Sequence, residues 1–365
     1  MKIAIDIRTA GGEKAGKGWF TFHISQSLLQ LDHENEYILY AKDGIPGYEQ
    51  YKNATMKLMD KGGFSWHLAV ARDCKKEKVD LYISPSSYIT PALLPKSIKS
   101  LLIVHDLVAF FYPNTHNKKA TLIEKIFLKR AIKKATKVIT ISQNTKRDLI
   151  NKYNYEESKI SIIYCAAADD FKPLKKDLLG PFIKETNLPA NFFLAVGTLE
   201  PRKNYPTLIS AFSLIAKKHP DYHLIIVGGE GWDFEEIYRQ VKQNSLKGRV
   251  HFLGYLSTKS LVNLYNLAKA LVFPSFYEGF GIPPLEAMKC GCPVITSFSS
   301  SLPEVVGDSA ILIDPSSQAE IAAAMLKLIQ EPDLALNLSN RGRVQARKFS
   351  WQESARKLLE IIKES

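Results

Sequence analysis

Short apolar runs alternate with helix-like stretches through most of the chain, and the alternation starts twice. The first series opens with Ile3–Ile7 and the second with Phe192–Val196. Strands that alternate with helices form parallel sheets whose two faces are covered by helices. A chain of 365 residues is also too long for one ordinary core. The sequence therefore predicts an α/β protein with two doubly wound parallel-sheet domains.

The two series are separated by a stretch that shows neither pattern. Asp169–Pro173 and the mixture of lysine, leucine and proline that follows, up to Pro189, are typical of a linker. We therefore predict a first domain over 1–172, a linker over 173–189 and a second domain over 190–349. The remaining predicted strands are Tyr37–Ala41, Val79–Ile83, Leu101–His105, Val138–Ser142, Ile160–Tyr164, Leu224–Val227, Val250–Leu253, Ala270–Pro274, Pro293–Thr296 and Ile311–Ile313.

The charge of the chain points to an anionic partner. Its formal net charge is +12, with 45% hydrophobic residues, as in an ordinary globular protein. A positive excess of this size favours nucleic acid, anionic lipid or an anionic ligand. No recognised nucleic-acid-binding motif accompanies the charge, so we expect no nucleic-acid partner.

Cysteine usage and the N-terminus indicate a cytoplasmic location. The four cysteines have no metal-ligand spacing, which favours free buried thiols in a reducing compartment. Asp6 and Arg8 interrupt any apolar core near the N-terminus, so this stretch is typical of a strand and turn, not of a signal peptide. No apolar run is long enough to span a bilayer. We therefore expect a cytoplasmic protein.

Two carboxylates, Glu278 and Glu286, lie eight positions apart in Ser275–Val294 (SFYEGFGIPPLEAMKCGCPV). The preceding apolar run predicts a strand, and the two prolines followed by apolar residues and Gly291 predict a short helix. Glu278 is thus expected on the loop between strand and helix, and Glu286 about one turn into the helix. Backbone N–H groups at a helix N-terminus suit an anionic or hydroxyl-rich ligand. Acids are common at helix starts in any case, so the two glutamates alone are equally typical of an ordinary helix N-terminus.

This stretch resembles the donor-site signature, E-x7-E, of the retaining GT-B glycosyltransferases of family 4. The resemblance implies two Rossmann-like domains that face each other across a cleft, with the C-terminal helix 350–365 crossing back to the first domain. It implies a nucleotide-diphosphate sugar as donor, with Glu286 on the ribose and Glu278 and the backbone of Gly279, Phe280, Gly281 and Ile282 on the sugar. It also implies transfer with retention and without a metal or other cofactor.

A second donor-site element follows the first strand of the second domain. Residues 197–204 read GTLEPRKN, where the family most often has G-R-L-x-P-x-K-G. Lys203 occupies the position of the family lysine, while Thr198 replaces the arginine and Arg202 offers a guanidinium four positions later. Lysine and arginine both suit phosphate oxygens. We therefore predict that Arg202 and Lys203 bind the pyrophosphate; two basic residues on a solvated turn are the less favoured alternative.

Two features of the first domain also match the family. Gly16 and Gly18 follow the first strand in a glycine-rich loop that, by resemblance, faces the donor; Trp19-Phe20 stands where the family often has Arg-Tyr. His105 ends a predicted strand, at the edge where open α/β sheets bind ligands. Resemblance makes His105 and Glu278 the candidate catalytic residues, with Asp106 orienting the histidine. A histidine in this place is otherwise most often structural.

The basic excess is concentrated in Asn117–Lys137, which has a helical pattern. Apolar residues on one side of this helix should face the core, and lysines cover the other side. Leu122, Ile123 and Ile126 fall among the lysines. Interleaved basic and aliphatic residues are typical of a helix that contacts an anionic membrane surface, and a solvated basic face is the equal alternative.

The resemblance predicts a hexosyltransferase that acts on a saccharide or lipid-linked saccharide in surface polysaccharide or lipopolysaccharide synthesis. GDP-mannose is the favoured donor, and a UDP-sugar is the other option. Two alternatives remain open. One is a nucleotide-sugar epimerase or hydrolase of GT-B shape, and the other is a catalytically silent carbohydrate- or lipid-binding protein.

Overall fold

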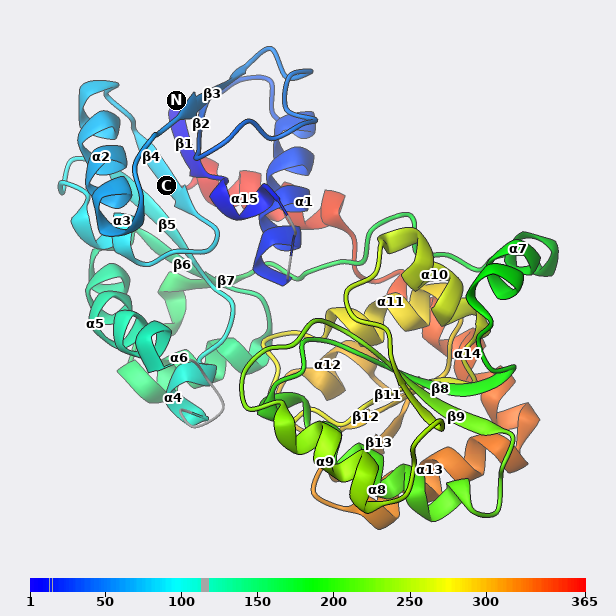
Figure 1. Cartoon of the computed structure of the whole chain (residues 1–365). Helices are drawn as coiled ribbons and strands as arrows, with labels where there is room; N and C mark the ends of the chain where they lie inside the picture. Colours follow the sequence, from blue (N-terminus) through cyan, green and yellow to red (C-terminus); the bar gives the residue numbers. More distant parts are fainter. Residues whose placement is uncertain (13, 15, 113–117) are drawn as a thin grey trace. The chain divides into compact units, whose positions relative to one another are not determined.

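The computed structural model describes residues 1–12, 14, 16–112 and 118–365. The chain divides into two compact units (Figure 1). Unit 1 consists of Met1–Cys165 and Ser350–Ser365, and unit 2 of Ala166–Phe349. Each unit has its own parallel sheet, as the double alternation predicted. No helix of the described chain is both long and apolar enough to cross a membrane.

Unit 1 is built on a seven-stranded parallel sheet with the order β3-β2-β1-β4-β5-β6-β7. Ile3 pairs with Tyr37 on one side and with Leu81 on the other, so the strand order reverses at β1. This reversal is the doubly wound topology. The strands are β1 (Lys2–Asp6), β2 (Glu36–Ala41), β3 (Ala54–Leu58), β4 (Leu81–Ser84), β5 (Lys99–Val104), β6 (Lys137–Thr140) and β7 (Ile160–Ile162).

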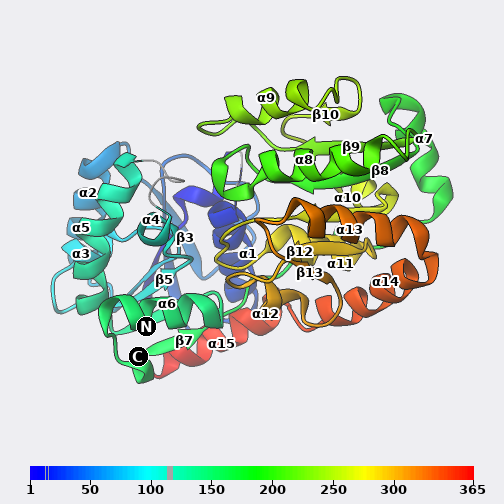
Figure 2. The ribbon, with the colours of Figure 1, turned by 90° about the horizontal axis from the view of Figure 1, so that it is seen from below.

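Helices cover both faces of this sheet (Figures 1 and 2). Trp66 of α2 and Leu128 of α5 lie in cores under one face. On the other face, Phe20 of α1 contacts Trp351 of α15, with ring centroids 5.6 Å apart. The helices of unit 1 are η1 (Arg8–Ala10), α1 (Gly16–Leu31), α2 (Gly63–Lys76), α3 (Ile89–Leu93), α4 (Val108–Phe111), α5 (Lys118–Lys134), α6 (Gln143–Tyr153), η3 (Glu157–Lys159) and α15 (Trp351–Lys363).

The C-terminal helix α15 belongs to unit 1, as expected from the family resemblance. It begins where predicted, because the Ser350 hydroxyl accepts a hydrogen bond from the backbone N–H of Glu353. The Ser354 hydroxyl also donates to the carbonyl of Tyr164, which follows β7. These contacts join the end of the chain to the sheet formed by its beginning.

Unit 2 contains a six-stranded parallel sheet with the order β10-β9-β8-β11-β12-β13. Its main core is formed by the sheet with α8 and α13, including Phe212 and Met325, which are fully buried. The strands are β8 (Asn191–Val196), β9 (Tyr222–Val227), β10 (Val250–Phe252), β11 (Ala270–Phe273), β12 (Val294–Ser297) and β13 (Ile311–Ile313). The helices are α7 (Lys176–Thr186), η4 (Pro201–Lys203), α8 (Tyr205–Ala216), α9 (Glu235–Gln243), α10 (Thr258–Leu267), α11 (Ile282–Cys290), α12 (Leu302–Val306), α13 (Gln318–Gln330) and α14 (Pro332–Ala346).

Three segments differ from the predictions. The predicted linker, 173–189, contains helix α7, which was not expected because Gly180 and Pro181 are helix breakers; unit 2 begins earlier, at Ala166. Strand β3 was not predicted, since it lies at the edge of the sheet and is only partly buried. The glycine-rich loop was placed too far along the chain, because Gly16 and Gly18 lie in the first turn of α1.

Candidate functional site

The candidate donor site lies where the strand order of unit 2 reverses. β8 pairs with β9 on one side and with β11 on the other. Ligands of open α/β sheets bind at the carboxyl ends of strands beside such a reversal. The loop after β8 carries Arg202 and Lys203, and the loop after β11 carries Glu278. Both sequence motifs therefore reach the same edge of one sheet.

Close backbone contacts fix the loop after β8. A Cβ atom on Gly228 would lie 2.0 Å from the carbonyl oxygen of Gly197, and Gly228 has φ +153°, so only glycine fits there. The Tyr205 hydroxyl donates to the same Gly197 carbonyl at 2.7 Å. The buried Asn204 side chain donates to the carbonyls of Pro274 and Pro315 at 3.2 and 2.6 Å. These contacts hold Lys203 against the β11 loop.

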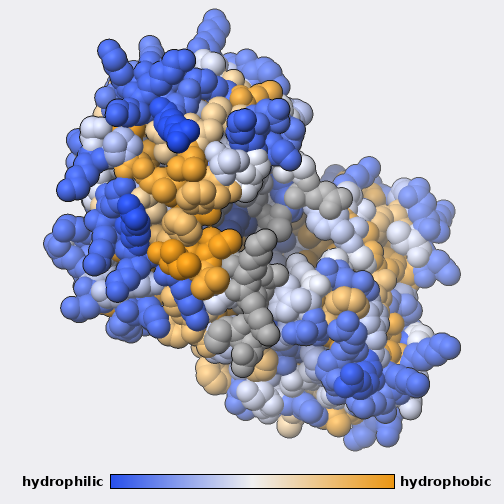
Figure 3. Space-filling model, turned by 60° about the vertical axis from the view of Figure 1, so that its left-hand side comes forward, coloured by the Kyte–Doolittle hydropathy of each residue, from blue (hydrophilic) through white to orange (hydrophobic). Residues whose placement is uncertain are grey.

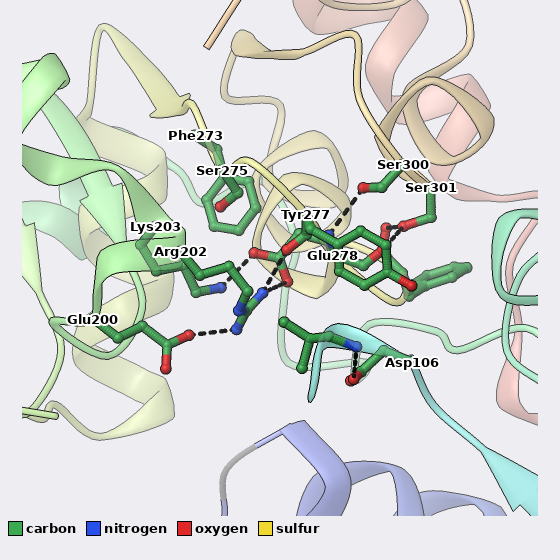
Figure 4. A network of polar contacts seen from close by, with 12 residues as sticks. Asp106, Glu200, Arg202, Lys203, Phe273, Ser275, Tyr277, Glu278, Ser300 and Ser301 are labelled. Carbon is green, nitrogen blue, oxygen red and sulfur yellow. Dashed lines mark hydrogen bonds and ion pairs between the residues drawn. The ribbon is translucent and has the colours of Figure 1, made fainter. Parts of the chain in front are cut away.

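Arg202 and Lys203 both bind the carboxylate of Glu278 (Figure 4). Lys203 Nζ lies 2.7 Å from Glu278 Oε1, and Arg202 Nη1 lies 2.7 Å from Oε2. Arg202 Nη1 also donates to the carbonyl of Tyr277 at 2.7 Å, and Nη2 pairs with Glu200. Two cations and two carboxylates thus form one cluster whose formal charges balance.

The cluster keeps Glu278 ionised. Burial by itself raises the pKa of this carboxyl, but the charges of Arg202 and Lys203 outweigh burial and lower the pKa to about 2. Burial lowers the pKa of Lys203, and the Glu278 charge opposes that effect. Lys203 Nζ also lies 4.7 Å from the centre of the Phe273 ring, a cation–π contact. The ion pair therefore fixes both side chains in a buried position.

Two serines after β12 hold the backbone of the Glu278 loop (Figure 4). Ser300 Oγ accepts from the backbone N–H of Glu278 at 2.9 Å, and Ser300 itself has φ +53°. Ser301 Oγ donates to the carbonyls of Glu278 and Phe280 at 2.8 and 2.6 Å. The Phe280 ring is buried and packs edge-on against Phe349. Phe280 can therefore offer a ligand its backbone, while its side chain belongs to the core.

Helix α11 starts at Ile282, directly after Gly281, as predicted. Gly281 has φ +123°, a conformation that favours glycine. Glu286 lies in the second turn, where its Oε2 accepts a hydrogen bond from the Tyr265 hydroxyl at 3.0 Å. Burial raises the pKa of Glu286 to about 8, and the bond from Tyr265 opposes that rise. A pKa of about 8 means that Glu286 is mainly protonated at neutral pH.

His105 lies in unit 1 at the end of β5 and is buried. Its Nε2 lies 2.5 Å from the carbonyl oxygen of Pro85, and its ring packs edge-on against Phe20. Burial and then the charge of Lys17 lower its pKa to about 4, so the imidazole is neutral and Nε2 donates to the carbonyl. Asp106 does not orient the ring through that nitrogen; its Oδ1 accepts from the backbone N–H of Val108, the first residue of α4.

The structure brings Arg202, Lys203 and Glu278 together and places Glu286 on the following helix. Gly16, Gly18 and His105 belong to unit 1. Gly18 has a packing role, because a Cβ atom there would lie 2.5 Å from the carbonyl oxygen of Thr9. Sequence reasoning did not find the site contacts of Glu200, Tyr265, Ser300 and Ser301. Only the serine run directly after β12 was a usable signal, since it follows the carboxyl end of a strand.

Comparisons with known proteins identify the family. The model of the family described as glycosyl transferases group 1 matches residues 181–345, and that of Glycosyltransferase Family 4 matches residues 15–171. An O-antigen chain mannosyltransferase B of Escherichia coli is 32% identical over 285 residues, which are 78% of this chain and 74% of the relative. The O-antigen chain mannosyltransferase RfbU of Salmonella typhimurium is 33% identical over 247 residues, 68% of this chain and 65% of the relative.

The fold also matches solved structures. Anabaena Alr3699/HepE, in complex with UDP and glucose, superposes with a TM-score of 0.83 at 18% identity, over the full length of both chains. WaaG, a glycosyltransferase involved in lipopolysaccharide biosynthesis, gives a TM-score of 0.77 at 18% identity and 99% coverage of each chain. At this identity the likeness concerns the fold alone. Together, the two family models, the mannosyltransferase relatives and these folds show that the chain belongs to glycosyltransferase family 4 and has the GT-B fold.

Proposed function

We propose that this glycosyltransferase moves a hexose from a nucleotide-diphosphate sugar to a saccharide or lipid-linked saccharide, with retention and without a metal. GDP-mannose is the favoured donor, because the two relatives described above are named as O-antigen chain mannosyltransferases. A UDP-sugar is the other option, since HepE was solved with UDP and glucose. The same names favour a role in O-antigen or related surface polysaccharide synthesis, which we place at the cytoplasmic face of the membrane as part of this proposal.

The cluster of Arg202, Lys203 and Glu278 at the strand reversal is the observation that carries this proposal. A departing nucleoside diphosphate gains negative charge, and fixed cations that meet this charge stabilise the transition state. Glu278 keeps both cations in place before the donor arrives. When the diphosphate takes over their charge, Glu278 is released to accept hydrogen bonds from the sugar hydroxyls. Glu286 on α11 would bind the ribose in this arrangement, and His105 the transferred sugar.

Replacing Lys203 by alanine is expected to weaken the binding of GDP or UDP by about 1–3 kcal/mol, the usual loss for a hydrogen bond to a charged group. Calorimetric titration of the nucleotide measures this change. Lys242→Ala, an exposed lysine of α9 in the same unit, is the matched control and should leave the affinity unchanged. Unchanged affinity in Lys203→Ala, in a protein that still folds, would contradict the assignment of the donor site.

The activity itself is tested with a panel of nucleotide sugars and short mannose-containing oligosaccharides as acceptors. We expect an extended oligosaccharide, with GDP-mannose as the best donor, and NMR of the new linkage should show the anomeric configuration of the donor. Release of free sugar with no extended product would instead favour a hydrolase. Absence of donor turnover in a protein that binds the nucleotide would favour a silent binding protein.

We further propose that α5 contacts an anionic membrane surface. Asn117, where the predicted helix began, lies outside the described residues, but the helix is present from Lys118. Leu122 and Ile126 are 60% and 57% exposed, and Lys125 and Lys129 beside them are exposed as well. Figure 3 views the side of the molecule on which α2, α3 and α5 lie and shows hydrophobic surface there among hydrophilic surface. Aliphatic side chains among lysines suit the interface of an anionic bilayer.

This contact predicts salt-sensitive sedimentation with vesicles that contain phosphatidylglycerol, and none with pure phosphatidylcholine. The double variant Leu122→Ser/Ile126→Ser should lose most of the binding, because it removes the exposed aliphatic side chains and leaves every charge. Leu336→Ser/Val344→Ser is the matched control, since these side chains of α14 are equally exposed. Equal sedimentation with both kinds of vesicle would exclude an electrostatic membrane contact.

A further inference from the structure

Unit 1 has a cavity of about 250 Å³ at the amino ends of β5 and β6. β5 has six residues and runs from this cavity toward His105, so about 20 Å of strand separates the two ends. The cavity belongs to the opposite edge of the sheet from the one at which ligands of such folds bind. It is lined by Pro91, Leu94, Pro95, Lys96, Ile98, Lys99, Ser100, Lys133, Lys134 and Thr136.

Four of the ten lining residues are lysines, and all the others are uncharged. In the described part of the chain, no carboxylate side chain forms an ion pair with Lys96, Lys99, Lys133 or Lys134. The nearby Lys137 holds Glu364 at 2.9 Å, so that carboxylate is already engaged. The four lysines therefore give the cavity a local positive charge, which the terminal carboxyl group of Ser365, in contact with Lys99 Nζ, balances only in part.

Two of the lysines are held in place by the backbone. Lys134 Nζ donates to the carbonyls of Ala92, at 3.1 Å, and Leu94, and Lys99 Nζ donates to a backbone oxygen of Ser365. Burial, and then the charges of Arg130 and Lys96, lower the pKa of Lys134. Lysine side chains on an ordinary solvated surface spread apart to reduce their mutual repulsion. Here packing brings them to one cavity instead.

The other lining groups determine which kind of ligand the cavity could bind. Thr136 Oγ1 accepts from the backbone N–H of Ser100 at 3.1 Å, so its own proton can be donated to a ligand. Pro91, Leu94, Pro95 and Ile98 form an apolar wall beside the ammonium groups. Ammonium groups and a hydroxyl suit phosphate oxygens, and the apolar wall suits a non-polar substituent of the same ligand.

We propose that this cavity is a second anion site, which binds a phosphate group carried by a molecule with an apolar portion. Two sources share this chemistry: a soluble phosphate ester and the headgroup of an anionic phospholipid. The site is distinct from the pyrophosphate site proposed in unit 2 and from the exposed aliphatic residues of α5. Neither the donor site nor the α5 contact needs to be correct for the cavity to bind phosphate.

The test uses the full chain and two probes. Phenyl phosphate represents the soluble source, and vesicles of phosphatidylglycerol in phosphatidylcholine represent the lipid source. The local readout for phenyl phosphate is protection of Lys99 from acetylation, measured by mass spectrometry, because binding in unit 2 would not protect that lysine. The readout for vesicles is cosedimentation at several salt concentrations.

Two double variants with the same loss of charge are compared. Lys96→Gln/Lys133→Gln removes two exposed lysines of the cavity and leaves the backbone contacts of Lys134 and Lys99 intact. Lys217→Gln/Lys218→Gln removes two exposed lysines of unit 2 that belong neither to the cavity nor to α5. The cavity variant should need at least about 10-fold more phenyl phosphate for half-protection of Lys99, since each lost charged hydrogen bond costs about that factor or more, and the control should need less than about 2-fold more.

A greater loss of vesicle binding in the cavity variant than in the control would support the proposal and identify the lipid headgroup as the source. Protection by phenyl phosphate together with equal vesicle binding in the two variants would support it with a soluble ester as the source. The proposal is overturned if phenyl phosphate does not protect Lys99 of the wild-type chain and the chain does not sediment with anionic vesicles. It is also overturned if the two double variants lose the same amount of Lys99 protection and the same amount of vesicle binding. Equal losses would show a general effect of net charge.

Discussion

Replacing Glu278 by glutamine is expected to destabilise the protein by about 3 kcal/mol, because it leaves two buried cations without their carboxylate. Arg202 and Lys203 both lie 2.7 Å from this side chain, and Glu278 is only 8% exposed. Urea unfolding of the variant and the wild type measures the difference. Glu185→Gln, an exposed acid of α7 in the same unit, is the matched control and should change stability by no more than about 0.5 kcal/mol.

The contribution of Glu278 to the stability of the fold should change with pH in one direction. The folded-state pKa of Glu278 is lowered to about 2 from an ordinary value of 4.5. Its contribution is therefore complete above about pH 4.5 and is lost as the pH falls toward 2. The difference in stability between wild type and Glu278→Gln should shrink over that range. A difference that stays constant down to pH 2 would mean that the ion pairs do not hold Glu278 ionised.

The same variant shows whether Glu278 only balances the charge of the two cations or is itself needed to bind the diphosphate. In Glu278→Gln the two cations lack their charge partner, so GDP or UDP should raise the melting temperature of the variant more than that of the wild type. This follows because the diphosphate supplies the negative charge that was removed. GDP and UDP lack the transferred hexose, so any contact of Glu278 with that hexose does not affect the comparison. A smaller rise in the variant would show that Glu278 itself is needed to bind the diphosphate.

The positions of the strands along the chain could be predicted from the sequence because they follow a regular alternation of apolar and helical segments. All strands but β3 were found, since a buried parallel strand is an uninterrupted apolar run. Helix α7 was missed because Gly180 and Pro181 lie inside it, against local propensity. Gly16 and Gly18 were assigned to a loop for the same reason, whereas Gly18 is required by the close approach of α1 to Thr9.

The residues of the candidate site could be predicted, but their partners could not. Glu278, Lys203 and Arg202 stand in motifs that identify the family by sequence alone. Their ion pairs join residues 75 and 76 positions apart, because β8 and β11 are neighbours in the sheet. The bond between Tyr265 and Glu286 likewise depends on how α10 packs against α11. Such contacts follow from tertiary packing, which no spacing in the sequence encodes.

Compared with the wild type, a Glu286→Gln variant is expected to become more stable as the pH rises. The pKa of Glu286 in the folded chain is raised from 4.5 to about 8. Between these values the folded state keeps a proton that the unfolded chain has lost, so the stability of the wild type falls as the pH rises through this window. Glutamine keeps an oxygen that can accept from the Tyr265 hydroxyl and has no proton to lose.

Urea unfolding at pH 5 and pH 8.5 should show that the free energy of unfolding falls by about 2–3 kcal/mol more for the wild type than for Glu286→Gln. This value is below the full effect of the pKa shift because the side chain is partly exposed.

The binding of a nucleotide should also depend on the protonation of Glu286. A ribose diol donates hydrogen bonds best to an ionised carboxylate, so GDP or UDP should displace the proton of Glu286 and bind more tightly as the pH rises toward 8. Calorimetry in buffers of different ionisation enthalpy would detect this proton release in the wild type and not in Glu286→Gln. Equal proton release by both proteins would place the ribose away from Glu286.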